Sequence, residues 1–257
     1  EYGLDRPPLV QYGSYVWGVM HGDLGKSISN NERPVKQMIA EKFPTTAFLA
    51  IMAMTTALVI GIPMGIIAAL KHNKMLDRAA MGFVLLLVST PAFVFAPLLM
   101  IVFSLKLEWF PIAGWNGPEY YVLPVAVLAA RPTALLARFM RSSMLDVIRQ
   151  DYVRTAYAKG LSPAKVLFKH AFKNAFLPVL TVLGNTFGFL LTGSFVVETI
   201  FTVPGIGYES IQSILRRDYP VIQGVALLVA VIFIVVNLLV DVIYGLVDPR
   251  VRLEEAR

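Results

Sequence analysis

Part of a phosphate-binding sequence is the first chemistry that the chain suggests. Residues 25–27 read Gly-Lys-Ser, which ends the P-loop pattern G-x-x-x-x-G-K-[ST], whose backbone amides hold nucleotide phosphates. The pattern requires a glycine at position 20, where this chain has Met20, and no clear apolar strand precedes it. Because only the last three positions match, the sequence does not predict nucleotide binding at this segment.

No other combination of residues predicts catalysis. The 3 histidines, His21, His72 and His170, lie far apart in the sequence, and the chain contains no cysteine. The metalloprotease pattern H-E-x-x-H, the hydrolase pattern G-x-S-x-G and clustered carboxylates are all missing. Because it has no cysteine, the chain can form neither disulfides nor thiolate metal sites. We expect a protein without catalytic residues, without a metal site and without a cofactor of its own.

Long segments without charge indicate a membrane protein. Hydrophobic residues make up 56% of the chain and charged residues only 16%, whereas an ordinary soluble domain has about 25% charged residues. A helix of about 20 apolar residues crosses the hydrocarbon core of a bilayer. The sequence therefore predicts an all-α, polytopic membrane protein with five transmembrane helices. They are expected near residues 44–70, 79–105, 121–141, 178–198 and 221–247.

Basic residues are distributed unevenly among the loops between these helices. Fourteen lysines and arginines fall in the loops 71–78, 138–173 and 248–257, and only three fall in 106–120 and 198–220. Basic loops remain in the cytoplasm. We therefore expect a cytoplasmic 138–173 loop, a cytoplasmic tail at 249–257 and an extracytoplasmic segment at 1–43. That location, where ATP is not supplied, also disfavours a P-loop at residues 25–27.

The basic loop contains the most specific pattern in the chain. Gly160 suits the left-handed position that ends a helix. Ser162 suits a helix N-cap, and Pro163 suits the first helical position after it. Residues 151–178 are therefore expected to form a helix, a tight turn and a second helix.

The second of these helices is predicted to be amphipathic. Lysines four residues apart would form one basic stripe, at Lys165, Lys169 and Lys173. The neighbouring face would be apolar, with Phe168, Ala171, Phe172 and Ala175 but without Val166. Such a helix could lie on anionic lipid or dock into a groove of a cytoplasmic partner protein.

The same loop resembles the EAA coupling loop of type I ABC importer permeases. Arg154-Thr155-Ala156 stands where that family has Glu-Ala-Ala, Gly160 follows, and Leu177-Pro178 closes the segment. The arginine and the longer spacing before Leu177-Pro178 are similar to the dipeptide, oligopeptide and nickel branch, whose pattern D-Y-V-R-T-A-x-A-K-G-L matches residues 151–161. Segments 22–35, 197–220 and 248–250 resemble the B-type subunit of that branch.

The resemblance implies a permease subunit of an ATP-driven, binding-protein-dependent importer of di- or oligopeptides in a bacterial or archaeal plasma membrane. Residues 44–248 would be its type I transmembrane domain, with the cytoplasmic coupling loop at 151–178. Such permeases have six transmembrane helices, so the first is expected to be missing from a truncated chain. Nickel or another small solute is the alternative cargo, and an ATP-independent channel, a secondary transporter or a membrane scaffold are the alternative classes.

The resemblance also implies the partners. They are a paired C-type permease subunit, two cytoplasmic ABC ATPases that bind ATP and Mg, an extracytoplasmic solute-binding protein and the lipid bilayer, but no nucleic acid. The residues expected at the ATPase contact lie in the coupling loop. They are Tyr152, Arg154, Thr155, Ala156, Lys159, Gly160, Ser162, Pro163, Lys165, Lys169 and Phe172.

Polar residues inside predicted spans are candidates for the translocation pathway. Arg131 lies within a span, where it would face a cavity and meet a peptide carboxylate or backbone carbonyls, pair structurally or extend toward the membrane surface. Asn237 and Asp241 share one face of the last helix and would form interhelical hydrogen bonds or have a role in solute or proton movement. Glu198 and Glu209, in the outer loop, would contact the binding protein or be solvated.

Overall fold

The computed structural model describes residues 7–247, without the side chains of residues 192, 193, 241 and 243–247. Within this range the chain is helical apart from its loops and one isolated bridge between Lys26 and Pro34. The predicted all-α fold is therefore confirmed. The predicted tail at 249–257 lies outside the described residues.

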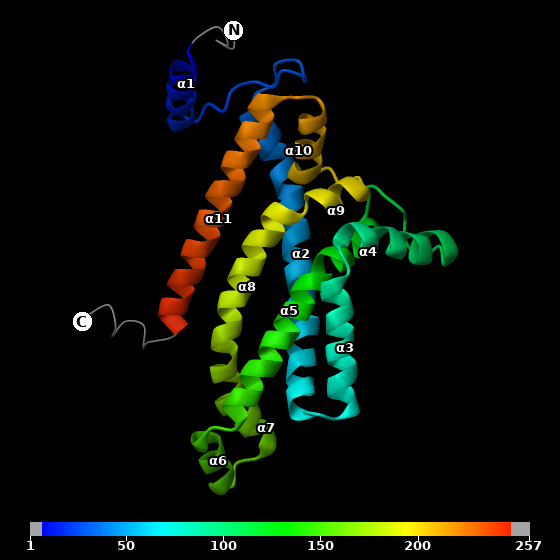
Figure 1. Ribbon diagram of the computed structural model, residues 1–257, viewed down its shortest axis with the longest axis vertical. Coiled ribbons are helices and arrows are strands. Elements are labelled where there is room, and N and C mark those ends of the chain that lie inside the picture. Colours follow the sequence, from blue (N-terminus) through cyan, green and yellow to red (C-terminus); the bar gives the residue numbers. More distant parts are fainter. Residues whose placement is uncertain (1–6, 248–257) are drawn as a thin grey trace, which may run out of the picture.

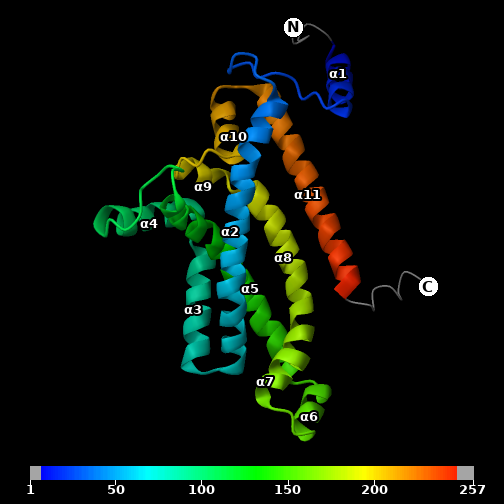
Figure 2. The same cartoon turned by 180° about the vertical axis from the view of Figure 1, so that it is seen from behind.

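Long helices run along the axis of the molecule, short helices lie at its ends, and α4 and α9 lie near its middle (Figures 1 and 2). In chain order they are α1 (Pro8–Met20), α2 (Val35–Leu70), α3 (Met75–Ser89), α4 (Ala92–Leu99), η1 (Met100–Lys106), η2 (Pro118–Tyr120), α5 (Val122–Ile148), α6 (Asp151–Ala158), α7 (Pro163–Lys165), η3 (Val166–Phe172), α8 (Lys173–Gly193), α9 (Phe195–Ile200), α10 (Ile206–Leu215) and α11 (Tyr219–Val247). Both η1 and η3 are π-helices, and η2 is a 3₁₀-helix.

The described part of the chain contains four helical segments that are long and apolar enough to span a membrane. They are Val35–Leu70, Pro118–Ile148, Pro163–Ile200 and Tyr219–Val240. A fifth span exists if Met75–Ser89 and Ala92–Lys106 count as one bent unit. The chain is thus a multi-pass membrane protein, as its composition predicts.

The prediction of one continuous helix over 79–105 is wrong. Helix α3 ends at Ser89, and the segment from α4 to η1 leaves it at an angle of 107°. The cause is Pro91, whose ring disfavours helical backbone at the preceding residue, and Thr90 is extended with ψ 115°. Figure 1 shows α4 pointing away from the long helices.

Helix α2 begins at Val35, well before the predicted start near residue 44. One face of its first turns is buried because Val35 and Met38 pack against Ile206 of α10 and Val221 of α11. Pro44 lies inside the helix without ending it. Membrane helices tolerate proline where neighbouring helices and side chains satisfy the freed carbonyl.

Helices α2 and α5 pack with their backbones close together. A Cβ atom on Gly65 would lie 2.5 Å from the Ala137 carbonyl oxygen, and one on Gly61 would lie 2.7 Å from the Thr133 carbonyl oxygen. Glycines spaced as G-x-x-x-G permit this approach in membranes. This close packing of α2 on α5 fixes the position of the α5 end that leads into the 151–178 loop.

Candidate functional site

The corner between α6 and α7 has a closed, hydrogen-bonded geometry. Gly160 has a φ of +75°, the left-handed conformation that its position predicted. The Leu161 amide donates to the Ala156 carbonyl and the Gly160 amide donates to the Tyr157 carbonyl, which is the Schellman arrangement of a helix C-terminus. Ser162 occupies the N-cap position with Pro163 after it, but its hydroxyl forms no capping hydrogen bond.

A small hydrophobic cluster supports this corner. Val153, Ala156 and Val166 are buried together, with Val147 and Leu161 packed against them. The amide of Asn174, at the start of α8, also donates to the Tyr152 hydroxyl at 2.9 Å. The loop therefore has its own packing and is tied to the long helices at both of its ends.

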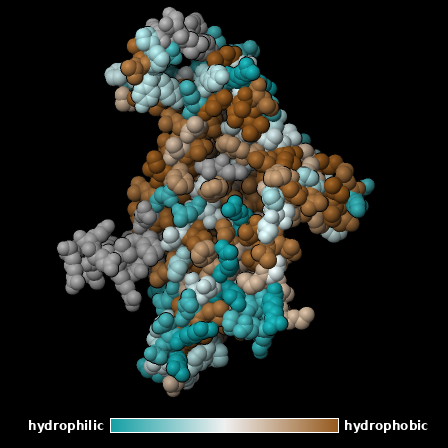
Figure 3. Space-filling model, in the orientation of Figure 1, coloured by the Kyte–Doolittle hydropathy of each residue, from teal (hydrophilic) through white to brown (hydrophobic). Residues whose placement is uncertain are grey.

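The structure brings most of the predicted coupling residues to one exposed end of the molecule. Arg154, Thr155, Lys159, Gly160, Ser162, Pro163, Lys165 and Lys169 are exposed there, and Tyr152 is 41% exposed. Ala156 is buried in the small cluster, and Phe172 is half-buried and packs on the main core. These two side chains position the loop rather than face outward. Figure 3 shows this end of the molecule as predominantly hydrophilic.

The predicted apolar face is wrong at two positions. Val166, placed outside it, is buried, and Phe168, placed within it, is 65% exposed. The reason is that residues 166–172 form a π-helix rather than an α-helix, and π-helices are frequent at functional sites. Its wider turn changes which residues share a face. Phe168 and Tyr157, which is 50% exposed, place aromatic rings among the exposed cations, and the sequence did not single out either as outward-facing.

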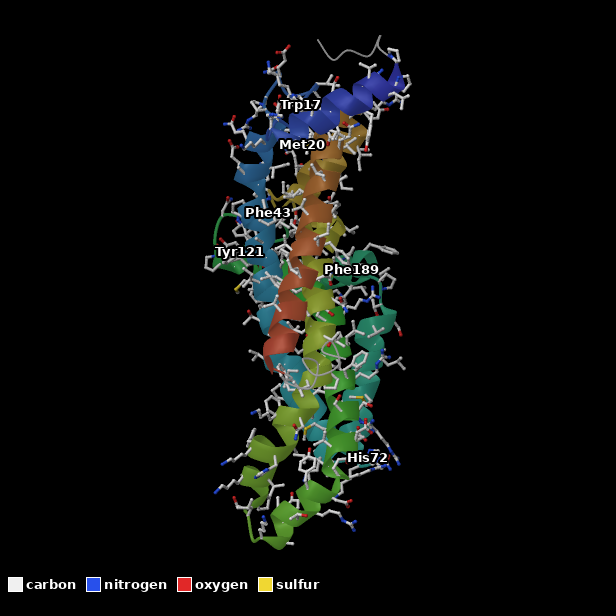
Figure 4. The ribbon with its side chains drawn as sticks, turned by 90° about the vertical axis from the view of Figure 1, so that its left-hand side faces the viewer. Trp17, Met20, Phe43, His72, Tyr121 and Phe189 are labelled. Atoms are coloured by element: carbon white, nitrogen blue, oxygen red, sulfur yellow. The ribbon has the colours of Figure 1, made fainter. Side chains whose placement is uncertain are left out.

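An ion-pair cluster holds the helices from which the loop extends. Asp77 of α3 is only 2% exposed and accepts from Arg141 of α5 at 2.6 Å and 2.7 Å, one contact to each carboxylate oxygen. The Asn73 amide also donates to Asp77, and Arg141 donates to His72 Nδ1 at 3.1 Å. His72 lies at this end of the molecule in Figure 4, far from Trp17 and Met20. The cluster joins the α2–α3 turn to the last turns of α5.

Glu198 is buried at the other end of the core. Its side chain is 0% exposed and accepts hydrogen bonds from the Thr46 and Ser194 hydroxyls and from the Gly207 and Tyr208 amides. The expectation that Glu198 is solvated or contacts a binding protein is therefore wrong. Its carboxylate joins α2 and α9 to the N-terminus of α10, where free backbone amides favour an anion.

Ser27 of the Gly-Lys-Ser segment binds the carboxylate of Asp218, which belongs to the same chain. Asp218 is 1% exposed and accepts from the Ser27 and Ser29 hydroxyls and from the Ile28 and Ser29 amides. The loop thus fastens the segment after α1 to the turn between α10 and α11. Burial raises the pKa of Asp218, but the hydrogen bonds from Ser27 and Ser29 outweigh it and hold the pKa below its usual value.

Acidification is expected to release this loop. Because the pKa of Asp218 is lower in the folded protein, the carboxylate stabilises the fold above its unfolded pKa of about 4, and this contribution falls as pH drops further. The protection factors of the Ile28 and Ser29 amides, which compare exchange with the intrinsic rate at the same pH, should fall at acid pH, and Asp218→Asn should lower them at neutral pH. The Ser27 amide, which donates to the Arg33 carbonyl, is the internal control. Equal exchange in both proteins would contradict this assignment.

The pathway candidates occupy different places. Arg131 lines a cavity of about 380 Å³ between α4, α5, α8 and α9, with Asn185 of α8 in the same wall. The Asn237 side chain donates to the Phe233 carbonyl of its own helix at 2.8 Å, rather than to another helix. The side chain of Asp241 lies outside the described part of the chain. The sequence did not single out Asn185, because an isolated asparagine in an apolar helix has no distinctive spacing.

Comparison with known proteins agrees with the geometry. The family described as binding-protein-dependent transport system inner membrane component matches residues 61–253. The dipeptide transport system permease protein DppB of Bacillus subtilis (strain 168) is 46% identical over 254 residues, which cover 99% of this chain and 82% of that protein. The glutathione transport system permease protein GsiC of Salmonella choleraesuis (strain SC-B67) is 44% identical over 252 residues, covering 98% and 82%.

Two solved structures have the same fold at low sequence identity. The inward-facing methionine ABC transporter MetNI aligns with a TM-score of 0.69 and 14% identity, over 82% of this chain and 97% of that chain. An amino acid ABC transporter aligns with a TM-score of 0.58 and 22% identity. With the family match over most of its length and relatives above 40% identity, this chain belongs to the inner membrane components of binding-protein-dependent transport systems.

Proposed function

We propose that the chain is the B-type permease subunit of an ATP-driven importer of di- or oligopeptides. The observation that carries this proposal is the exposed, basic corner at Gly160, which is closed by its own hydrogen bonds and packed on its own cluster. A stiff element of this kind transmits a push from a partner protein, whereas a loose loop would absorb it. Relatives that carry dipeptide and glutathione in their names favour peptides over nickel as cargo.

The orientation and the partners follow from this proposal. The end formed by α6, α7 and η3 faces the cytoplasm, in agreement with its lysines and arginines. There it contacts one of the importer's two ABC ATPases, which bind ATP and Mg, so the chain itself is not an enzyme. The end formed by α10 and the loop after α1 faces the solute-binding protein. A paired C-type permease subunit completes the translocation pathway, to which this chain contributes Arg131 and, from α11, Asn237 and Asp241.

Uptake into proteoliposomes tests the proposed function. The chain, in its full-length form, is reconstituted with a paired permease, the ATPases and the binding protein, and peptides and nickel are offered with and without ATP. ATP-dependent accumulation of peptide is the expected result. Accumulation of metal alone would keep the mechanism and change the cargo, and equal flux without ATP would favour a channel or secondary transporter.

Valine at Gly160 should uncouple the importer. A β-branched residue at a φ of +75° is strained by about 1–3 kcal/mol, and about 1.4 kcal/mol corresponds to a tenfold change in an equilibrium. We expect Gly160→Val to lower ATP-dependent uptake about tenfold. The matched control is Gly82→Val in α3, because a Cβ atom there has no neighbour within 4 Å. Unchanged substrate-driven ATPase activity in the assembled Gly160→Val importer would refute the coupling role.

A further inference from the structure

The cavity between α4, α5, α8 and α9 lies within the membrane-spanning part of the chain. Its volume of about 380 Å³ is in the range of pockets that bind small molecules. Most of its wall is apolar, including Phe93 of α4, Leu128 of α5 and Val197 of α9. Such a wall accepts side chains of many shapes without selecting one by hydrogen bonding.

Three polar side chains interrupt this wall, Arg131 from α5 and Asn185 and Thr186 from α8. Arg131 of α5 lies about 14 Å along the helix from Val122, and Asn185 belongs to α8. Within the described part of the chain, neither side chain has an ion-pair or hydrogen-bond partner. The nearby Thr186 hydroxyl is already used, because it donates to the Val182 carbonyl at 2.6 Å.

The charge in the cavity has no complement among the lining residues. None of them is an aspartate or glutamate. An arginine within a membrane span is unfavourable unless it faces a partner or a water-filled cavity. The guanidinium forms two parallel hydrogen bonds with a carboxylate, and the asparagine amide supplies a further donor. An apolar, low-dielectric wall strengthens such bonds.

We propose that Arg131 and Asn185 form a carboxylate-binding site for the C-terminal carboxylate of the peptide in transit, with its side chains against the apolar wall. The proposal rests on the proposed function, because it takes the solute to be a peptide. It assigns the permease a selective step of its own, separate from recognition by the binding protein. Transport of a peptide whose C-terminal carboxylate is blocked should therefore not depend on Arg131.

The test compares a free peptide with its amide in the complete importer. Alanyl-alanine and its C-terminal amide are offered to phosphatidylcholine proteoliposomes at concentrations that saturate the binding protein. Arg131→Gln should lower uptake of the free peptide about tenfold, as expected for a charge-assisted hydrogen bond, and leave uptake of the amide near the wild-type value. Arg131→Lys should retain part of the activity. Asn185→Leu should show a smaller defect of the same selectivity.

A control variant and the lipid composition distinguish a carboxylate site from a structural or lipid-binding arginine. Arg138→Gln removes an exposed arginine of α5 that does not line the cavity, and it should leave uptake of both peptides unchanged. Equal loss of free and amidated peptide in Arg131→Gln would indicate a structural role and overturn the proposal. So would a defect that appears only with phosphatidylglycerol in the liposomes, since it would assign Arg131 to a lipid phosphate. A wild-type importer that takes up no peptide would instead contradict the proposed function.

Discussion

Asparagine in place of Asp77 is expected to lower the free energy of unfolding by about 3 kcal/mol. The substitution removes the negative charge that Arg141 contacts at 2.6 Å and 2.7 Å and leaves the guanidinium without its ionic partner. Removal of one partner from such an ion pair is costly, because Arg141, which is only 23% exposed, would keep His72 as its remaining side-chain partner. Denaturation of the purified protein in mixed micelles measures the change.

The position of the cluster gives this variant a functional consequence. Arg141 lies in the last turns of α5, directly before the loop that begins with α6. A loosened α5 should transmit less of any force applied at the Gly160 corner, so ATP-dependent uptake should fall with stability. The control is Asp146→Asn, which removes an exposed aspartate from the same end of α5. If Asp77→Asn and Asp146→Asn have equal stability, the ion pair does not support the loop.

Glutamine in place of Glu198 is expected to cost about 2–3 kcal/mol of stability. Two hydroxyls and two backbone amides donate to this carboxylate, and all of them are held in place by α2, α9 and α10. An amide of the same size turns an NH₂ group toward donors, which leaves buried polar groups without acceptors. The N-terminus of α10 should then separate from α9.

Hydrogen exchange locates this effect. The amides of Gly207 and Tyr208 should lose protection in Glu198→Gln, while the amides of α5 should not. Because Val197 lines the cavity next to Glu198, uptake driven by the binding protein should fall more than the basal ATPase activity of the assembled importer. Glu209→Gln, on a half-buried residue of α10, is the matched control. Retained protection at Gly207 and Tyr208 would show that Glu198 does not hold α10.

The sequence alone determined the features that depend on residues close to one another along the chain. The long apolar segments became helical because apolar composition is a local property, and a membrane requires each helix to satisfy its own backbone. The turn at Gly160 was predictable for the same reason, since a positive φ selects glycine at that single position. The family resemblance rests on such local strings, and the match over residues 61–253 confirms it.

Tertiary structure decided which prolines break a helix and which carboxylates are buried. Pro91 ends α3, but Pro44, Pro132 and Pro178 remain inside helices whose neighbours support them. Glu198 meets Thr46 across 152 positions of sequence, and Asp218 meets Ser27 across 191. Arg131 and Asn185, 54 positions apart, line one cavity for the same reason. Contacts between residues so far apart leave no periodicity in the sequence, because only the packing of whole helices brings them together.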